Sequence, residues 1–502
     1  MLQKYHFILF LCLITISPTF SQIIDSLIIQ RQTQIDSISI YFPDSIVTPH
    51  VVLITGPAIG NLKAFSNINK IEGHLLIKNT SIDSLVGLEN LKSLYSLQLE
   101  NNLKLQSISK FIYLTQTEFL MINDCPLLKS LDFIDSIETL GYLEIYGNTQ
   151  NLKKIGDFPN LKQLIAFSLG FNKGVDTIHI NDKLGDVDFL IIHNDDLLFF
   201  SAANIINNSI NNDHNNFRCI NLVMSDNKKL NYINASNSAT CFDRIEISSN
   251  PELKTCVIAE FSDSLVESFK IERNSKLESF TACNNIKTSG IIEINQNENL
   301  KELNCFKNLK NALSISIFLN NVLKSLNGAF VLVDTIGNVS VPKSGLSILN
   351  NKNLNNIEDL NEVIYINRIN IKDNKRLGLC SIKSICNHID AGRLIELDAD
   401  NAPGCRSINQ IRLGCTTSSK DVTNSTKPFL YPNPFTDYVT VFGDELKSIE
   451  VLNIDGYSLF KTTLSQLSFQ KLNLENLPPA TYIIKIIYGN SQNTQMIKCI
   501  KL

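Results

Sequence analysis

The sequence predicts a mainly β protein in which a long solenoid of short parallel strands is followed by a small C-terminal β-sandwich. Two observations predict the solenoid: a polar marker residue, usually Asn, recurs every 22 to 24 residues, and each marker follows two apolar residues spaced one apart. A third observation predicts the sandwich, because a polar segment separates these repeats from several short β-patterns near the end. The 502 residues, 44% hydrophobic and 19% charged, suit a repeat array with one further small domain.

Residues 1–21 have the pattern of a secretory signal peptide. Lys4 precedes an apolar run, residues 7–16, and small residues precede the expected cleavage point after Ser21. The apolar run is too short to span a bilayer comfortably, and no later stretch looks transmembrane. The net charge of -4 gives no general attraction to nucleic acid. The sequence therefore predicts an exported chain that binds no nucleic acid and keeps no transmembrane segment after signal cleavage.

The repeats show how each coil of the solenoid is expected to form. LQLENNLKLQSI (97–108), RIEISSNPELKTC (244–256) and IIEINQNENLKEL (291–303) each contain two apolar residues one apart, a polar turn, an Asn and then a Leu three residues on. Each repeat should therefore make one short strand with alternate side chains in a shared core. The predicted markers are Asn79, Asn102, Cys125, Asn148, Asn172, Asn194, Asn227, Asn250, Asn274, Asn297, Asn320 and Asn374.

The physical reason for a repeated Asn is the sharp turn after each strand. That turn leaves backbone groups buried, and an inward-facing amide both donates and accepts hydrogen bonds, so stacked Asn residues can satisfy the turn of every coil. Cys125 is the usual apolar substitute at such a position. Two gaps between markers are longer than the rest, and the Asn-rich segment 201–217 in the first of them is expected to form a solvated loop.

These phrases resemble leucine-rich repeats, and in particular the receptor L-domain-like repeats of bacterial surface proteins, although Leu stands three residues after the Asn where two is usual. The resemblance implies a leucine-rich-repeat-type solenoid with caps over residues 22–415. The segment 33–62 resembles the family's N-terminal cap, but Asp44 and Ser45 stand where a capping cysteine is expected. The cysteine-bearing segment 377–415 resembles the family's closing segment.

Export makes disulfides possible. Cys380, Cys386, Cys405 and Cys415 are expected to form two bridges at the closing end of the solenoid, with three connectivities open. Two further pairs, Cys219/Cys241 and Cys283/Cys305, are each 22 residues apart, so each is either bridged between adjacent coils or left as buried thiols. Because none forms a CxxC motif and no His follows at zinc spacing, neither a metal site nor any other cofactor is expected.

Residues 416–428 form a predicted polar linker, and residues 429–502 the predicted β-sandwich. The sandwich begins with the motif Tyr431, Pro432, Asn433, Pro434 and Phe435. It resembles the C-terminal sorting domain of type IX secretion in this YPNPF motif, in NIDG (453–456), in LPPATYIIKI (477–486) and in the final IKCIKL. The resemblance implies handling by the type IX secretion machinery, and a chain that passes through the periplasm and is secreted or attached to the outer surface of a Gram-negative bacterium.

No catalytic motif is recognisable in the sequence, so we do not expect an enzyme. The strand residues that should face away from the core form the candidate binding surface: Gln98, Glu100, Glu144, Tyr146, Glu246, Lys270, Glu272, Glu293, Asn295, Phe318 and Lys372. The expected function is that of a secreted or cell-surface binding protein, for adhesion or capture of a protein or glycan ligand. A passive structural surface protein is the alternative, and a secreted hydrolase a further one.

Overall fold

The structure is a computed structural model that describes residues 26–420 and 428–501, except 109, 148–149, 181–183, 185–186, 203–219, 236–241, 259–264, 432–434, 436 and 489–492. The predicted signal peptide (1–21), most of the predicted loop at 201–217, and both Cys219 and Cys241 lie outside the described residues. The chain divides into two compact units, one up to Ile408 and one from Asn409, and each is described by itself.

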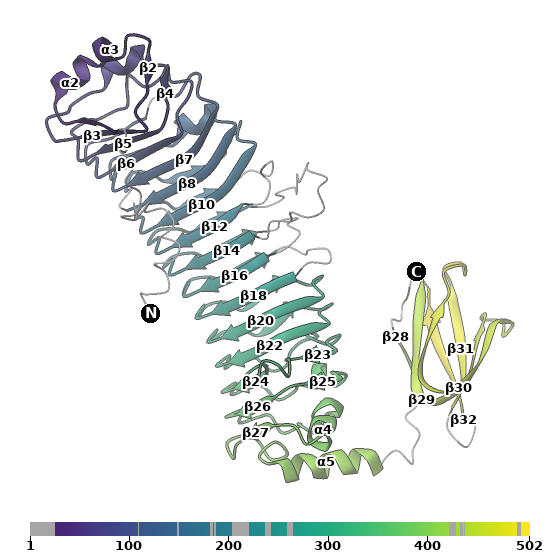
Figure 1. Cartoon of the computed structure of the whole chain (residues 1–502). Coiled ribbons are helices and arrows are strands. Elements are labelled where there is room, and N and C mark those ends of the chain that lie inside the picture. The colour runs from purple at the N-terminus through teal and green to yellow at the C-terminus, as the bar shows by residue number, and fades with distance from the viewer. Residues whose placement is uncertain are drawn as a thin grey trace. The chain divides into compact units, whose positions relative to one another are not determined.

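The first unit is a parallel β-solenoid of about 14 turns over residues 26–397, so the predicted mainly β solenoid is confirmed (Figure 1). One long parallel sheet, called here the main sheet, receives one strand from each coil. Its strands are β1 (Ser26–Ile29), β3 (Val51–Thr55), β5 (His74–Lys78), β6 (Ser96–Glu100), β7 (Gln116–Asn123), β8 (Thr139–Tyr146), β10 (Gln163–Gly170), β12 (Asp188–Ile192), β14 (Ile220–Ser225), β16 (Phe242–Ser248), β18 (Leu265–Glu272), β20 (Thr288–Asn295), β22 (Asn311–Phe318), β24 (Gly345–Leu349), β26 (Ile369–Lys372) and β27 (Ile395–Leu397), with the short β23 (Thr335–Ile336) and β25 (Tyr365–Ile366).

A second parallel sheet runs through the middle coils, which the prediction of one strand per repeat did not include. It contains β9 (Lys154–Gly156), β11 (Thr177–His179), β13 (Phe199–Ser201), β15 (Tyr232–Ala235), β17 (Thr255–Ile258), β19 (Ser279–Ala282) and β21 (Glu302–Cys305). The central residues of these strands, such as Phe200 and Phe280, are in register and buried. The middle coils are therefore closed by hydrogen-bonded strands on two sides of the core.

The core is filled by the alternate side chains of the main strands and by Phe residues from the turns. Ile245 and Ile247 of β16 are fully buried. Further along, the ring of Phe306 packs edge-on against Phe269 at 4.8 Å and stacks on Phe330 at 5.6 Å. Burial of aromatic side chains in register supplies much of the apolar contact between neighbouring coils.

The Asn residues form a buried ladder from Asn172 onward. Each backbone N–H donates to the Oδ1 of the Asn in the next coil, as from Asn250 to Asn274 (3.0 Å). Each side-chain amide donates to a strand carbonyl of the coil before it, as from Asn274 to Ile247 (2.9 Å). One amide therefore satisfies two backbone groups of the neighbouring coil. The same pattern holds for Asn172, Asn194, Asn227, Asn250, Asn274, Asn297, Asn320, Asn351 and Asn374. Asn401 accepts from Asn374 and donates to Ile371 O, and all ten are buried.

The first coils depart from this pattern, and the predicted marker Asn79 is wrong. Asn79 is exposed, and the buried position is Thr80, whose N–H and hydroxyl both donate to Asn102 Oδ1 (3.2 and 2.7 Å). A Thr can stand there because its hydroxyl supplies one of the polar contacts that an amide makes elsewhere. After β7 the buried Cys125 occupies this position, and its thiol donates to the carbonyl of Asn123 (3.6 Å). Asn148 lies outside the described residues.

Two ladder positions, Asn351 and Asn401, are absent from the predicted set. Asn351 lies in the long gap between Asn320 and Asn374, in a coil that contains an extra turn closed by a bridge between Asn338 and Val341. Its phrase, LSILNNKNL, has the same spacing as the other repeats, so the sequence contained the signal. Asn401 accepts the N–H of Asn374 and ends the ladder inside the disulfide-bonded cap.

The two ends of the solenoid are covered by short elements. At the first end these are α2 (Gln32–Asp36), α3 (Ile38–Tyr41), the strand pair β2 (Ile46–Val47) and β4 (Lys70–Ile71), and the 3-10 turn η2 (Lys63–Asn67). Later turns include η3 (Asp132–Ser136) and η4 (Glu358–Leu360). The closing end carries α4 (Lys383–Asp390). These elements cover the apolar edge that a terminal coil would otherwise expose. Helix α5 (Ile408–Lys420) follows in the chain.

The closing cap contains two disulfides, as predicted, and the structure selects one of the three connectivities. Cys380 pairs with Cys405, and Cys386 pairs with Cys415. Cys283 and Cys305 are unbridged and buried, so the thiol alternative is correct for that pair. Helix α5 continues to Lys420, so the first residues of the predicted polar linker (416–428) are helical.

The second unit contains an antiparallel sheet with its own core. Its strands are β28 (Phe429–Tyr431), β29 (Tyr438–Leu452), β30 (Ser458–Asn473), β31 (Thr481–Tyr488) and β32 (Asn493–Ile500). A turn at Asp455-Gly456, within the NIDG motif, joins β29 to β30, with Gly456 at a φ of 87°. Val441, Ile449 and Ile484 are fully buried in its core.

A buried lysine fixes the end of the last strand in this unit. The Lys501 ammonium donates to the carbonyls of Leu474, Glu475 and Leu477 at 2.8, 2.6 and 2.6 Å, and the residue is 7% exposed. Next to it the Phe435 N–H donates to Ile500 O at 2.9 Å. The first and last segments of the unit are thereby held together.

Candidate binding surface

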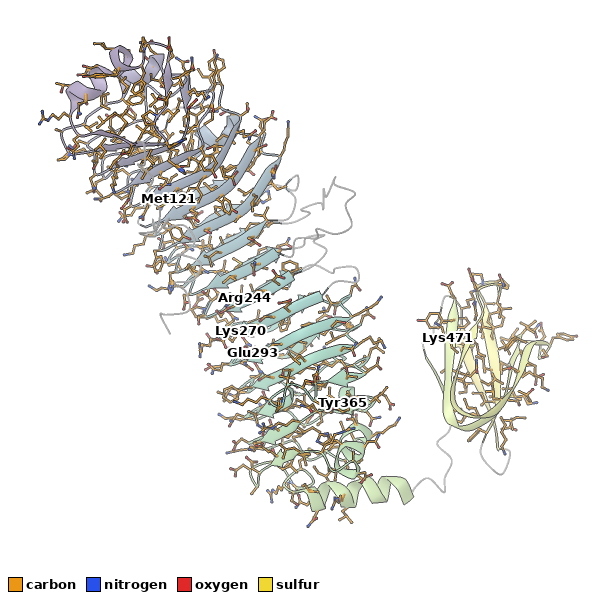
Figure 2. All side chains as sticks on the ribbon, in the orientation of Figure 1. Met121, Arg244, Lys270, Glu293, Tyr365 and Lys471 are labelled. Atoms are coloured by element: carbon orange, nitrogen blue, oxygen red, sulfur yellow. A yellow bond between two sulfur atoms is a disulfide. The ribbon has the colours of Figure 1, made fainter. Side chains whose placement is uncertain are left out.

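The candidate surface is the ribbon, which we define as the outward-facing side chains of the main sheet. Strand pairing arranges the predicted residues in two rows. One row contains Gln98, Glu144, Glu246, Lys270 and Glu293, and the other contains Glu100, Tyr146, Glu272, Asn295, Phe318 and Lys372. Glu100 is exposed and most of the others are half-buried. Met121, Arg244, Lys270 and Glu293 mark this face in Figure 2.

The ribbon of β7 and β8 carries an aromatic patch, defined as Phe119, Met121, Tyr142 and Tyr146. The Phe119 and Tyr142 rings face each other across the strand pair with centroids 6.0 Å apart. The sequence prediction included only Tyr146 of this group. Tyr142 lies two and four positions before Glu144 and Tyr146, so it has the same alternation along β8. Phe119 pairs with Tyr142 on the neighbouring strand, so the sequence pattern could have identified both positions.

Small residues on the next strand leave the aromatic patch uncovered on one side. The ribbon positions of β10 are Ala166, Ser168 and Gly170, which pair with Tyr142, Glu144 and Tyr146. A Cβ at Gly170 would lie 2.8 Å from two ring carbons of Tyr146, so the Tyr146 ring lies over the glycine. On this strand the patch therefore has only small side chains, those of Ala166 and Ser168, as neighbours.

The ribbon of β16, β18 and β20 carries a charged cluster, defined as Arg244, Glu246, Lys270, Glu272 and Glu293. Lys270 Nζ lies 2.9 Å from Glu272 Oε1 and 3.9 Å from Glu246 Oε1. Partial burial alone would lower the pKa of Lys270, but its hydrogen bond to Glu272 and the charges of Glu246 and Glu293 raise it. The ammonium form is therefore held firmly in place.

Glu246 corrects the prediction that every ribbon residue is solvent-facing. It is 3% exposed, is ion-paired with Arg244, and accepts a hydrogen bond from Ser248 Oγ (3.1 Å). A buried carboxylate needs such partners, because desolvation would otherwise destabilise its charged form. Glu246 thus contributes to the packing of the sheet more than to its exposed surface.

The last coils carry a second ion network on the ribbon. Glu396 of β27 is ion-paired with Arg368 and with Lys372 (2.6 Å to Lys372). Their hydrogen bonds lower the pKa of Glu396. Phe318 is half-buried in the same row as Lys372, two strands away. The charged cluster begins four strands after the aromatic patch, in the direction of the closing cap.

One group of acidic side chains has the spacing of a cation site among the described residues. Oxygens of Asp373, Asp398 and Asp400 lie within 4.8 Å of one another. The Asp398 carboxylate also accepts the backbone N–H of both Asp373 and Asp400, so it caps the turn. Partial burial and the Asp398 charge raise the pKa of Asp373. The group is explained by this turn, and no observation beyond the spacing points to a metal.

Among the described residues, the buried cysteines and the buried His388 have structural roles. Burial raises the pKa of Cys125 to about 11 and of Cys256 to about 12, so both thiols stay protonated. The two ring nitrogens of His388 lie 3.1 and 2.9 Å from the carbonyls of Ile366 and Leu394. Burial lowers the pKa of His388.

The sorting motif is only partly described. Tyr431 ends β28, and Phe435 is 1% exposed in the core of the second unit. Pro432, Asn433 and Pro434 lie outside the described residues. Among the described residues, no helix has both the length and the apolar character needed to cross a membrane.

Two family models match the chain. The secretion system C-terminal sorting domain matches residues 429–501, and the LRR domain of the endo-beta-N-acetylglucosaminidase EndoS matches residues 42–166. No curated protein and no solved structure matches it. The first match covers the antiparallel unit, and the second covers early coils whose strand pairing continues through the rest of the solenoid. The chain is therefore a leucine-rich-repeat-type solenoid protein with a type IX secretion sorting domain, which implies secretion or export to the cell surface.

Proposed function

We propose that the solenoid is a binding module that captures a protein or glycan ligand on its ribbon outside the cell. The observation that carries the proposal is the aromatic patch, in which the rings of Phe119 and Tyr142 stand in register beside the small residues of β10. Stacked parallel strands hold these rings in place before any ligand arrives, so little further ordering is needed on binding.

A binding role fits the ribbon better than a hydrolytic one. Paired carboxylates for general acid and base chemistry need different environments and access to substrate. The carboxylates of Glu246 and Glu272 are instead joined to Arg244 and Lys270, and Glu246 is buried. The part of the EndoS enzyme that the chain resembles is its LRR domain. We therefore propose binding without catalysis.

The test is a glycan and protein array probed with the purified full chain, followed by titration of whatever binds. We expect Tyr142→Ala combined with Tyr146→Ala to weaken binding about tenfold or more, because aromatic residues often dominate such surfaces. Tyr113→Ala is the matched control, since Tyr113 is 53% exposed and lies outside the main sheet. Turnover of the bound ligand would contradict the proposal, and a chain that binds nothing would favour a passive structural role.

We also propose that the exported chain reaches the surface through the periplasm, and that the sorting domain is recognised by the type IX secretion machinery. The support is the match of residues 429–501 to the sorting-domain family. Fusion of residues 416–502 to an unrelated exported reporter tests the proposal. The reporter should appear outside the cell, and a folded fusion that stays periplasmic would contradict it.

A further inference from the structure

A second row of side chains runs beside the ribbon, at the turn that follows each main strand. The residue just before each ladder position except Asn401 has a left-handed backbone, with φ between 49° and 78°. These residues are Asn79, Asn101, Asp124, Gly147, Phe171, His193, Asp226, Ser249, Arg273, Gln296, Leu319, Asn350 and Asp373. Asn, Asp and Gly tolerate this conformation and account for most of the row, whereas bulky side chains disfavour it.

Phe171 is therefore an unusual occupant of its coil, and His193 stands at the same turn position of the next coil. Their rings stack with centroids 4.8 Å apart and an interplanar angle of 16°. Neither ring is a core residue: Phe171 is 50% exposed, and His193 is exposed as well. A strained backbone that presents an exposed aromatic pair is a reason to look for a ligand at that point.

Carboxylates stand at both ends of the aromatic pair. On one side the neighbouring row position is Gly147, which contributes no side chain, and the Asp124 carboxylate reaches into the space that a Cβ at Gly147 would fill. On the other side His193 Nε2 lies 3.8 Å from Asp226 Oδ2. The exposed ring of Phe171 thus has the Asp124 carboxylate one coil away at the Gly147 position. In the other direction the Asp226 carboxylate lies two coils away, beyond His193.

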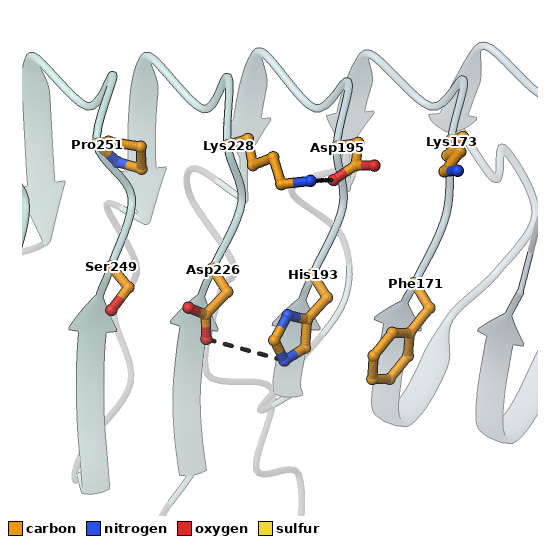
Figure 3. A pocket seen from close by; sticks show the side chains of 8 residues that line it. All are labelled: Phe171, Lys173, His193, Asp195, Asp226, Lys228, Ser249 and Pro251. Carbon is orange, nitrogen blue, oxygen red and sulfur yellow. Dashed lines mark ion pairs between the residues drawn. The ribbon is translucent and has the colours of Figure 1, made fainter.

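The row is one wall of a hollow of about 500 Å³. Figure 3 shows Phe171, His193, Asp226 and Ser249 at the strand ends, opposite a parallel row that contains Lys173, Asp195 and Lys228. Lys228 Nζ lies 2.7 Å from Asp195 Oδ1, which fixes the second wall across two coils. The hollow therefore combines an aromatic surface with charged and hydroxyl groups within a volume that a small ligand fills.

We propose that this hollow binds one pyranose unit of a carbohydrate. A pyranose ring has an apolar face of C–H groups, which suits packing on the exposed ring of Phe171, and equatorial hydroxyls around its edge. Carboxylates accept strong hydrogen bonds from such hydroxyls, and Asp226 and Ser249 lie in the same row. The site lies at the turns, beside the ribbon, so it does not depend on the binding function proposed for the aromatic patch.

The charges of the hollow favour a neutral sugar over a phosphate or other anion. Asp195 and Asp226 both line it, and Lys228 is already paired with Asp195. An anionic ligand would meet these carboxylates at close range. Lys173 adds one positive charge at the rim, so a comparison of neutral and acidic sugars measures how far charge contributes.

The experiment is saturation-transfer NMR on the full chain with the methyl glycosides of glucose, galactose, mannose and N-acetylglucosamine, and with glucuronic acid as the acidic probe. We expect at least one neutral glycoside to bind at millimolar concentration, with the strongest transfer to the protons of one ring face. Phe171→Asn should weaken that binding about tenfold or more. This variant should fold at least as well, because Asn occupies the same left-handed position in other coils.

The matched control is Phe199→Ala, since Phe199 is 48% exposed but belongs to the second sheet. Its loss should leave glycoside binding unchanged. A second variant, Asp226→Asn, should weaken binding severalfold while it preserves the stacked rings. The proposal is overturned if no probe shows transfer, if Phe171→Asn binds like the wild-type chain, if Phe199→Ala weakens binding as much as Phe171→Asn, or if only glucuronic acid binds.

Discussion

The solenoid and the C-terminal unit are both β structures, yet they are stabilised in different ways. In the solenoid every strand pairs with its neighbours in parallel, and the Asn ladder repeats one set of hydrogen bonds from coil to coil. In the C-terminal unit, long antiparallel strands share one core, and Lys501 joins the last strand to a distant loop. A change in the solenoid should therefore act locally, whereas a change in the C-terminal unit should act on the whole unit.

The largest effect is expected from Lys501→Met. The substitution leaves the carbonyls of Leu474, Glu475 and Leu477 without their donor in a buried position. We expect the C-terminal unit to lose about 3–5 kcal/mol, enough to unfold much of a small domain. Urea unfolding of residues 416–502 measures this, with the exposed Lys461→Met as control. Equal midpoints for the two variants would contradict the role given to Lys501.

Loss of a cap disulfide should come next and should remain local. Cys380→Ala removes the bridge to Cys405, which closes 25 residues at the end of the solenoid. We expect a loss of about 2–4 kcal/mol in the closing cap. Hydrogen exchange should show faster opening of α4 and β27 but unchanged protection of β16 and β18. Faster exchange along the whole solenoid would show that its coils are more strongly coupled than the ladder implies.

A single ladder substitution should have a smaller effect. Asn274→Leu removes the acceptor of the Asn250 N–H and the donor to Ile247 O, at a cost of about 1–3 kcal/mol. Asn299→Leu is the control, because the exposed Asn299 amide donates only across the surface to Ser275 O. Both variants are compared by the midpoint of urea unfolding. If the two substitutions lower the unfolding midpoint equally, the buried ladder has no special role in stability.

The smallest effect concerns the charged cluster and pH. The pKa of Lys270 is raised in the folded chain, so its contribution is fully present below the unfolded value near 10.4 and is lost as pH rises through the folded value. Because Lys270 is partly exposed, the contribution is about 1 kcal/mol or less. The unfolding midpoints of Lys270→Met and the wild-type chain should differ at pH 8, and the difference should shrink as the pH rises above the unfolded pKa of about 10.4. A difference between the two midpoints that grows with pH would contradict the predicted direction of the pH dependence.

The repeat pattern made much of the solenoid predictable, because each coil must satisfy the same backbone groups. Asn274 and its neighbours recur at a spacing that only this requirement explains. Asn79 was misplaced by one residue because two adjacent polar residues, Asn79 and Thr80, could both fill the position. Asn351 was missed because the extra turn before it lengthened its coil.

The surface was less predictable than the core. Alternation along a strand shows which side chains leave the core, but it does not show what covers them. Glu246 alternates correctly and is buried all the same, since its burial depends on the strands beside it. The Phe171–His193 stack likewise depends on two coils 22 residues apart having bulky residues at the same turn position. Pairing between coils decides both features, and no single repeat contains that information.

The central claim is that the C-terminal unit directs export while the solenoid folds and binds without it. The most direct measurement is the location and folding of a chain lacking residues 429–502, produced in its own host. The account predicts that the truncated chain stays in the periplasm and that its solenoid shows the same hydrogen-exchange protection as in the full chain. A truncated chain that reaches the medium, or one whose solenoid is unfolded in the periplasm, would contradict the claim.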